Sequence, residues 1–594
     1  MRASGGSDLR PSIGAFGQSF MHTPHFDAFS KTAVRFTRAY SVAPHCLPSR
    51  NAYMTGRKPD TSQVWSGGGL MNFRTVGPDW DTLPSFFRDR GYVAVGQGKV
   101  FHEYGNKPAP HRPAAGWGRT DNASWSPVGL PYFDPHPTGC PHAPGREEEA
   151  RLQGQGKCMC ATDQSGDDAI VANALHWLRT FTANRTQPFF LAVGLHRPHL
   201  PWSVPQEFFD LYDENSLAVA VHERVPKGMP PIAWHSCSRE EDMGSCIPKA
   251  TDEPDHPATP EEQRHTRHGY YAAVSYSDDR VGQVLAELSS SSFAANTIVS
   301  INGDHGADSA NPDCSALLLT RWMLVGWQLG EDNEYCKHTL FENALRTALM
   351  VHVPWLPKSF GTATSAIVSL LDLMPTLQEL AGFDVTPEQE GVSQAALFGT
   401  TVTEPALAQP PRTVALSQFP RCVRIGSEPP SQCKCKPCLR DFSSGLRLST
   451  GLLADWNENN CNNNLTTQYT VMGHTMRTAE GWRFTRWIQW NQTSLKPMWD
   501  SKDYGEELYD YRGEALLGDF DMQSDNLAVD PANAALVQQL RSQLRSQFEA
   551  TPAKSDDETV VHMSLQGAPL ALPRKEQLHF QQQEIGCFFH FGSA

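Results

Sequence analysis

The 594-residue chain has no long apolar run and comparatively little positive charge. No stretch approaches the ~20 consecutive apolar residues that a membrane-spanning helix requires, so the sequence predicts no membrane span. Lysine and arginine together number 50, against 65 aspartates and glutamates, which gives a formal net charge of −15. Because a nucleic-acid-binding protein normally carries a basic domain, we expect no nucleic-acid partner. An anionic substrate would need a local cluster of cations, since the overall field repels it.

The zinc-ribbon arrangement of two matched Cys-x-x-Cys pairs is missing, although the chain contains 14 cysteines. Five of them gather late in the sequence, at Cys422, Cys433, Cys435, Cys438 and Cys461. This group is open to two interpretations, a metal cluster and a set of disulfides. The lack of a second matching pair favours disulfides, which persist in an oxidising compartment.

The apolar core of a signal peptide is absent from the N-terminus, which begins Met-Arg-Ala-Ser-Gly-Gly-Ser. Glycosylation sequons nevertheless indicate the secretory pathway, and they begin at Asn122, Asn184, Asn464 and Asn491. An incomplete N-terminus would reconcile the two observations. We therefore expect a protein of the secretory pathway, either lysosomal or extracellular.

Apolar and aromatic residues are plentiful, at 39% and 10%, which excludes a disordered chain. At ~150 residues per domain the length suggests two to four units. Helical spacing of apolar residues predicts helices at 167–181 and 270–288. Short apolar runs predict buried strands at 34–40, 92–96, 189–194, 297–301 and 348–353. Such alternation predicts an α/β fold with a mostly parallel sheet covered by helices on both faces.

After about residue 400 the pattern changes to that of a smaller antiparallel α+β unit. A turn at 479–481 separates two of its strands, and residues 531–550 have the pattern of one amphipathic helix. The predicted strands are 413–419, 475–478, 482–490 and 507–511. We therefore divide the chain into residues 1–400, a C-terminal subdomain at 401–550 and a tail at 551–594, to which the sequence assigns no role.

The most specific segment is Cys46-Leu-Pro-Ser-Arg50, which continues to Thr55-Gly-Arg57. A strand is expected to end near Val42 and a helix to begin close to Pro48, where proline is well tolerated. Cys46 would then lie beside a helix N-terminus, which favours an anion and a deprotonated nucleophile, with Arg50 one turn further on. A capped helix with a buried structural cysteine fits the same residues.

This motif resembles the signature of the type I sulfatases, in which the cysteine is oxidised to formylglycine. The resemblance extends over roughly residues 8–545, and within the family it is strongest to the iduronate-2-sulfatases. Further matching segments are Asp8–Ser12, Gly98–His102, Phe189–His199, Gly303–Gly306, Lys337–Glu342, Leu371–Thr376 and Met472–Thr478. The resemblance implies an alkaline-phosphatase-like fold, with residues 1–400 as the catalytic domain.

The resemblance also implies a metal site and a cluster of catalytic groups. The metal ligands would be Asp8, the modified Cys46, Asp304 and His305. Oxygen-rich ligation suits a hard cation, with calcium preferred by resemblance and magnesium as the alternative. The catalytic residues would be Cys46, Arg50, Lys99, His102, His199 and Lys337, which together supply the local positive charge that an anionic substrate requires.

The implied reaction is hydrolysis of a sulfate ester by the hydrated formylglycine at position 46. One hydroxyl, activated by the metal and Arg50, attacks sulfur, while Lys99 and Lys337 neutralise the sulfate oxygens. His199 protonates the departing alcohol. His102 then deprotonates the second hydroxyl, which expels sulfate and regenerates the aldehyde.

The implied substrates are sulfated sugars, foremost 2-sulfated uronic acid residues of glycosaminoglycan-type polysaccharides, and the implied maturation partner is the formylglycine-generating enzyme. Three alternatives stay open. One is a sulfatase for another polymer such as a fucan or galactan, and another is a catalytically impaired relative that binds sulfated glycans. The third is hydrolysis of phosphate or phosphonate esters.

The sequence departs from the family pattern at two places. Ser7 stands where the family has the first of two adjacent metal-binding aspartates, and no apolar strand precedes it. Residues 307–326 are inserted between Gly306 and the Trp-x-Leu-Gly-Glu segment at 327–331. We interpret both as errors of a predicted gene, a late start and a retained intron, and expect the chain as written to be impaired.

Overall fold

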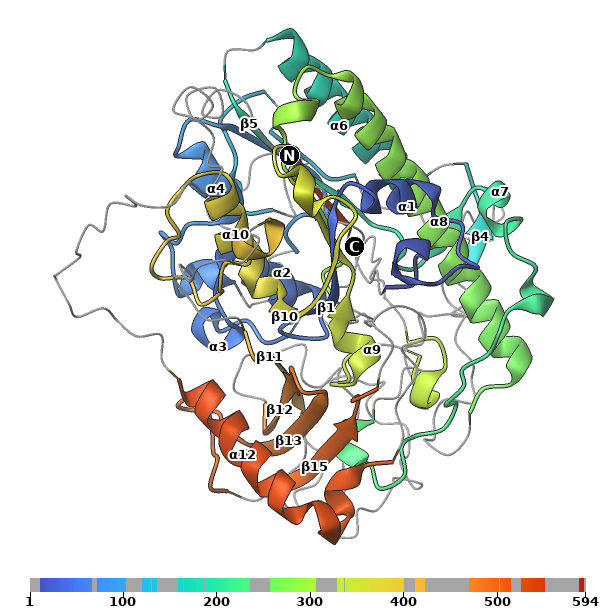
Figure 1. Ribbon diagram of the computed structural model, residues 1–594, viewed down its shortest axis with the longest axis vertical. Coiled ribbons are helices and arrows are strands. Elements are labelled where there is room, and N and C mark those ends of the chain that lie inside the picture. The colour runs from blue at the N-terminus through green and yellow to red at the C-terminus, as the bar shows by residue number, and fades with distance from the viewer. Residues whose placement is uncertain are drawn as a thin grey trace, which may run out of the picture.

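The computed structural model describes most of the chain outside several long segments, and Figure 1 gives its arrangement. The described residues are 11–66, 72–102, 120–129, 131–135, 159–163, 165–184, 187–234, 257–305, 328–335, 337–399, 412–421, 469–501, 503–513, 525–550 and the backbone of 587–591. Asp8, Ser7, the insertion at 307–326, the five late cysteines and Asn464 lie outside them. No helix among the described residues is long and apolar enough to cross a membrane.

The larger sheet is mixed and mostly parallel, as the sequence predicted. Its strands are β1 (Val34–Tyr40), β2 (Val93–Gly98), β3 (Tyr132–Phe133), β5 (Phe189–Leu195), β7 (Val299–Asn302), β8 (Arg346–Thr347), β9 (Leu349–His352), β10 (Ala363–Ser369) and β16 (Cys587–Phe591). They lie in the order β10-β1-β9-β7-β16-β5-β2-β3, with β8 paired to β1. The pairs β1–β10, β7–β16, β16–β5, β5–β2 and β2–β3 are parallel, whereas β9 and β8 run antiparallel to their neighbours.

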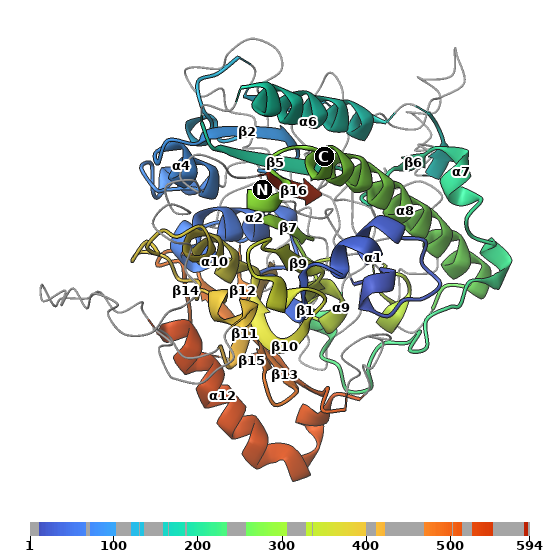
Figure 2. The same ribbon diagram turned by 45° about the horizontal axis from the view of Figure 1, so that its top comes forward.

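Helices cover both faces of this sheet because its central strands are apolar on both sides. In β5, Phe189 and Leu191 pack with one core and Phe190 and Ala192 with the other. The first core lies under α1 (Pro24–Ser30), α6 (Gly166–Ala183) and α8 (Pro260–Ser290). The second lies under α2 (Cys46–Thr55), α4 (Leu83–Arg88) and α10 (Leu373–Leu380). Figure 2 shows α6 and α8 on one side of the strands and α2, α4 and α10 on the other.

Capping residues set the start of the two long helices. The hydroxyl of Thr259 accepts a hydrogen bond from the backbone of Glu262, whose carboxylate reaches back to Thr259, and Pro260 occupies the first turn. Ser165 caps α6 in the same way with Asp168. The same part of the chain also contains the shorter segments α3 (Pro59–Ser62), β4 (Met159–Ala161), β6 (Trp202–Val204), α7 (Gln206–Phe209) and α9 (Glu342–Leu345).

The C-terminal subdomain, described over 412–421, 469–501, 503–513 and 525–550, has the predicted antiparallel α+β form. Its strands are β11 (Val414–Arg421), β12 (Val471–Thr478), β13 (Trp482–Asn491), β14 (Lys496–Pro497) and β15 (Asp503–Asp510), and its helix is α12 (Ala534–Glu549). The strand order is β11-β12-β13-β14, with β15 also paired to β13. Figure 1 shows this sheet and α12 together at the bottom of the view.

A buried cluster of charges joins the subdomain to the part of the chain that carries the larger sheet. Glu342, the first residue of α9, binds Arg477 Nε of β12 at 3.2 Å and Arg483 Nη2 of β13 at 2.6 Å. It also accepts a hydrogen bond from the Tyr40 hydroxyl at 2.7 Å, and Arg346 lies 3.8 Å away. Burial raises the pKa of Glu342, but Arg483, Arg477 and Arg346 outweigh it and hold that pKa at about 2. The Glu342 carboxylate is therefore charged in the folded protein at neutral pH.

The C-terminal tail supplies a strand in the middle of the larger sheet. The backbone of β16 pairs in parallel with β5, from Cys587 opposite Leu191, and with β7, from Cys587 opposite Val299. Figure 2 shows β16 between these strands. A central strand of this sheet is thus formed by a segment to which the sequence assigned no role.

Candidate active site

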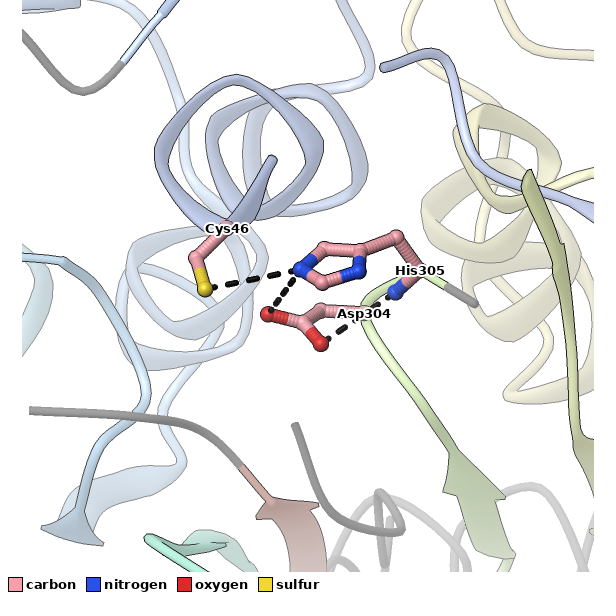
Figure 3. A group of neighbouring side chains, drawn as sticks. All are labelled: Cys46, Asp304 and His305. Atoms are coloured by element: carbon pink, nitrogen blue, oxygen red, sulfur yellow. Dashed lines mark hydrogen bonds and ion pairs between the residues drawn. The ribbon is translucent and has the colours of Figure 1, made fainter. Parts of the chain in front are cut away.

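Cys46 is the first residue of α2, close to where the sequence predicted the helix to begin. His45 caps this helix through its imidazole, which accepts a hydrogen bond from the Leu47 backbone N–H at 3.3 Å. The Cys46 side chain is buried, and it faces the loop that follows β7 (Figure 3). The free N–H groups at a helix start favour negative charge there.

Two positively polarised groups contact the Cys46 sulfur. Lys337 Nζ lies 3.2 Å from Cys46 Sγ, and His305 Nε2 lies 3.4 Å from it. Burial pushes the pKa of the Cys46 thiol upward, but Lys337, Lys99 and the His305 hydrogen bond outweigh burial and hold that pKa well below its ordinary value. The position therefore stabilises an anionic nucleophile, and Sγ marks where the oxygens of a modified residue 46 would lie.

Asp304 and His305 follow β7 at the carboxyl edge of the sheet, where open α/β sheets bind ligands. Donor atoms of Cys46, Asp304 and His305 lie within 4.8 Å of one another (Figure 3). The loop is held from below by the Ser49 hydroxyl, which donates to the Asp304 carbonyl. Hard divalent cations prefer oxygen ligands to sulfur. A residue 46 with oxygen in place of sulfur, together with the Asp304 carboxylate and the His305 imidazole, would therefore suit such a cation better than the set that contains the thiol.

Arg50 lies one helical turn after Cys46 and ties two parts of the site together. Its Nη2 pairs with Asp304 Oδ2 at 2.9 Å, and its Nη1 donates to the Lys99 carbonyl at 2.8 Å. Lys99 directly follows β2, and its backbone N–H donates to the Gly194 carbonyl at the end of β5. Burial lowers the pKa of Lys99 to about 7, opposed by Cys46 and reinforced by Arg50 and Lys337.

The two histidines singled out by the sequence are both buried beside this cation cluster. Burial, followed by Lys99, lowers the pKa of His102 well below its ordinary value. Burial, followed by Lys337 and Lys99, does the same for His199. His199 Nδ1 lies 2.8 Å from the Leu200 carbonyl, and because a carbonyl only accepts, Nε2 is the basic nitrogen of the neutral ring. His102 Nδ1 and His199 Nε2 have no hydrogen-bond partner among the described residues.

The structure thus brings Cys46, Arg50, Lys99, His102, His199, Asp304, His305 and Lys337 to one edge of the sheet, while Asp8 lies outside the described residues. The sequence did not single out the groups that hold the loop carrying His199. Asp167, at the start of α6, accepts the backbone N–H of His196 at 2.7 Å and of Arg197 at 3.0 Å. Asp134 pairs with His196 Nε2 at 2.8 Å. The sequence could have indicated Asp167 only through its position two residues after Ser165, the N-cap of α6.

Two further histidines were also missed, although each adjoins a residue that was singled out. His45 precedes Cys46, and His338 follows Lys337. Their rings stack with centroids 5.0 Å apart and planes 10° from parallel. Only the fold brings these two segments together, so adjacency in sequence to Cys46 and Lys337 was the one available signal.

Comparison with known proteins identifies the family to which this chain belongs. The sulfatase family model matches residues 4–383, so the chain belongs to the sulfatase family and is a sulfuric ester hydrolase. Mouse iduronate 2-sulfatase is 28% identical over 588 residues, which cover 90% of this chain and 91% of the mouse protein.

Solved structures agree on the fold. The phosphonate monoester hydrolase from Silicibacter pomeroyi superposes with a TM-score of 0.60 at 17% identity, covering 94% of this chain and 97% of that one. A 2-O GAG sulfatase superposes with a TM-score of 0.55 at 17% identity, covering 92% and 91%. At this identity both matches establish the fold alone.

Proposed function

We propose that the protein removes sulfate from 2-sulfated uronic acid residues of glycosaminoglycan-type polysaccharides, with formylglycine at position 46 as nucleophile. The observation that carries the reaction is the buried Cys46 at a helix N-terminus, contacted by Lys337 and His305 beside Asp304. The likeness to an iduronate 2-sulfatase over 90% of the chain supports the sugar, and the likeness in fold to a 2-O GAG sulfatase is consistent with it.

A divalent cation, calcium in this proposal and magnesium as the alternative, would be held by Asp304, His305, the modified residue 46 and Asp8. Its chemistry when bound is to polarise oxygens of the sulfate and of residue 46. The described donors fit such an ion because Asp304 and His305 converge on Cys46 at the sheet edge. Arg50, paired with Asp304, adds a fixed positive charge on the same side.

The first chemical step is attack of a residue-46 oxygen on sulfur, after its hydroxyl has lost its proton to solvent because Arg50 and the lysines favour the anion. The S–O bond to the sugar breaks on the opposite side, and the sugar alcohol leaves. Lys99 and Lys337 neutralise the sulfate oxygens. His199 donates a proton to the leaving alcohol from Nε2. Because burial and the two lysines keep the free ring neutral, His199 must take up this proton as the anionic ester enters and offsets the lysine charges.

The second step releases sulfate without attack of water on sulfur. His102 removes the proton of the second hydroxyl on residue 46, the C–O bond to sulfate breaks and the aldehyde forms again. The lowered pKa of His102 keeps the ring unprotonated at neutral pH, so that it can accept this proton.

Maturation in the secretory pathway is part of the proposal, with the formylglycine-generating enzyme as the partner that modifies Cys46. The sequon residues Asn122 and Asn184 are exposed, and Cys160 is disulfide-bonded, which supports an oxidising compartment. The Cys46 thiol is reduced, as conversion requires.

The test is a panel of substrates given to protein produced with the formylglycine-generating enzyme, with Cys46→Ala as the matched control. The panel holds an unsaturated 2-sulfated uronate disaccharide, a 6-sulfated glucosamine, sulfated fucan and galactan oligosaccharides, an aryl sulfate and a phosphonate monoester. We expect kcat/KM to be highest by at least tenfold for the 2-sulfated uronate. A higher value for a fucan or galactan sulfate would reassign the sugar. Preference for the phosphonate, or glycan binding without turnover, would contradict the reaction.

A further inference from the structure

The buried rings of His45, His338 and Phe419 form a stack beside Cys46 and Lys337. None of the three takes part in the reaction steps proposed above. His338 stacks on His45, with centroids 5.0 Å apart, and on Phe419, with centroids 4.8 Å apart. The planes are 10° and 12° from parallel, and His45 and Phe419 lie 6.4 Å apart. Because Phe419 lies on β11, the stack connects the segments carrying the nucleophile and the lysine to the C-terminal subdomain.

The segment that carries Lys337 has no regular structure of its own. Residues 337–341 form neither helix nor strand, and His338 adopts a left-handed backbone conformation with φ of 71°. A residue with a Cβ rarely adopts this conformation unless its surroundings impose it. The position of Lys337 therefore depends on the contacts made by its neighbour His338.

Arg421, two residues after Phe419, fixes the backbone at the same point. Its Nη2 donates to the His338 carbonyl at 2.7 Å, and its Nε donates to the Ile232 carbonyl at 3.2 Å. Its guanidinium lies over the Trp487 ring at 4.9 Å, which orients the planar group. Ring and carbonyl of His338 are thus both held by the end of β11.

The same strand also holds the segment that leads to Cys46. Ser417 Oγ donates to the Ser41 carbonyl at 2.6 Å, and the Gln418 N–H donates to the Val42 carbonyl at 2.9 Å. β11 therefore binds both the segment before residue 46 and the segment after residue 337. Their relative position determines the 3.2 Å contact between Lys337 Nζ and Cys46 Sγ.

We propose that His338, Phe419 and Arg421 are positioning residues that set Lys337 against residue 46, so that the C-terminal subdomain takes part in sulfate-ester cleavage. The inference rests on the role proposed above for Lys337. Catalytic groups tolerate about 1 Å of misplacement before losing roughly 10²-fold in rate, and loss of one ring permits a shift of that size. No change of protonation at either histidine is involved.

The experiment is a double-mutant cycle measured with an aryl sulfate. His338→Ala and Phe419→Ala are each made alone and together with Lys337→Ala, and the conversion of Cys46 is quantified by mass spectrometry in every variant. We expect each single variant to lower kcat by at least about tenfold per converted molecule. In the Lys337→Ala background the same changes should alter kcat by less than about twofold, because the group they position is gone. His338→Phe and Phe419→Tyr, which keep a ring, should retain most of kcat.

Phe484→Ala is the matched control for general damage to the subdomain. Phe484 is buried in the core between β13 and α12, away from the ring stack. It should lower the melting temperature while leaving kcat of the folded protein within about twofold. Equal losses of kcat with and without Lys337 would overturn the inference and leave the reaction standing. A fully active Lys337→Ala variant would overturn the role of the lysine and this inference with it.

Discussion

At the scale of single residues, the site concentrates positive charge inside an acidic protein. Arg50, Lys99 and Lys337 are buried around Cys46, although the chain carries a net charge of −15. Burying cations together is costly, and the lowered pKa values of Lys99, His102 and His199 record that cost. An anion that enters the site relieves it. We therefore expect this arrangement to favour sulfate esters over neutral esters.

Replacement of His102 and replacement of His199 are expected to impair different steps of the reaction. His102→Ala should trap a covalent sulfated enzyme, because attack proceeds while elimination lacks its base. His199→Ala should slow the first step, by roughly 10²–10⁴-fold, and most for alcohols of high pKa. Rapid-mixing kinetics with a series of aryl sulfates, together with intact-mass analysis, separates the two. The same dependence of both variants on leaving-group pKa would contradict the assignment.

Lys99 should give the reaction a pH dependence. With its pKa at about 7 instead of the ordinary 10.5, Lys99 is charged in the free protein below pH 7 and neutral above it. We expect kcat/KM, which reports the free enzyme, to fall as pH rises through about 7. Lys99→Arg should move this limb upward, while the exposed Lys358→Met should leave the profile unchanged. A limb that persists unchanged in Lys99→Arg belongs to another group.

The lowered pKa of Lys99 should also make the free energy of unfolding depend on pH. Between about pH 7 and 10.5 the unfolded chain keeps its proton on Lys99 while the folded chain has lost it. The unfolded state thus binds more protons in this window, so the free energy of unfolding should rise with pH there. Denaturant titrations of wild type and Lys99→Met should differ in this slope.

At the scale of elements, α9 and the C-terminal sheet depend on one carboxylate. Glu342→Gln would leave Arg477, Arg483 and Arg346 buried without their shared countercharge. Breaking such a pair from one side costs about 3–5 kcal/mol of unfolding free energy. The loss should appear as a lower denaturation midpoint at pH 7, whereas Glu287→Gln, which removes a surface pair with Arg179, should leave the midpoint unchanged. Equal midpoints for both variants would show that the cluster does not couple the two parts.

The acid stability of this cluster has a defined direction. The pKa of Glu342 is lowered in the folded protein, to about 2 from an ordinary 4.5. Its contribution is therefore complete above about pH 4.5 and is lost as pH falls toward 2. In Glu342→Gln this part of the acid-induced destabilisation should disappear.

The position of β16 between β5 and β7 leads to a further prediction. Removal of residues 587–594 should lower the melting temperature and reduce aryl-sulfate hydrolysis sharply, since β5 and β7 would lose the strand between them. Removal of residues 592–594 alone, beyond β16, should do neither. A peptide spanning the strand, added to the shorter chain, should restore part of the activity by strand addition. Unchanged stability after removal of the strand would contradict its place in the sheet.

Local patterns predicted the elements well where packing follows the sequence. The strand predicted at 34–40 coincides with β1, and the late strands and helix lie within a few residues of β11, β13 and α12. The helix predicted at 270–288 begins ten residues earlier, at Pro260, because its first turns are polar and depend on the Thr259 cap. β16 was beyond prediction, since parallel pairing joins segments separated by hundreds of residues.

Some residues of the candidate site could be predicted from the sequence, and others could not. Cys46 and Arg50 follow from one motif, and the resemblance to a family pointed to Lys99, His102, His199 and Lys337. The contacts of His338 with Phe419 and Arg421 could not be predicted, because the residues are about 80 positions apart and none has an unusual sequence context.

At the scale of the whole molecule, the larger sheet and the C-terminal subdomain are joined at the candidate site, and we expect them to act together in the reaction. The sheet edge supplies Cys46, Lys99, His199 and Asp304, while β11, β12 and β13 hold the segment from Lys337 to Glu342 in place. A sulfatase built in this way should lose activity when the sheet edge or β11 is disturbed, and the two kinds of loss differ. Damage at the edge changes the chemistry, and damage at β11 changes the position of one lysine.

Residue 46, once converted to formylglycine, is the proposed nucleophile for sulfate esters. The most direct measurement pairs mass spectrometry of the peptide containing residue 46 with kcat for an aryl sulfate, on preparations made with graded amounts of the formylglycine-generating enzyme. We expect turnover per molecule to be proportional to the converted fraction and absent from the unconverted thiol and from Cys46→Ala. Equal turnover by converted and unconverted protein would contradict the account.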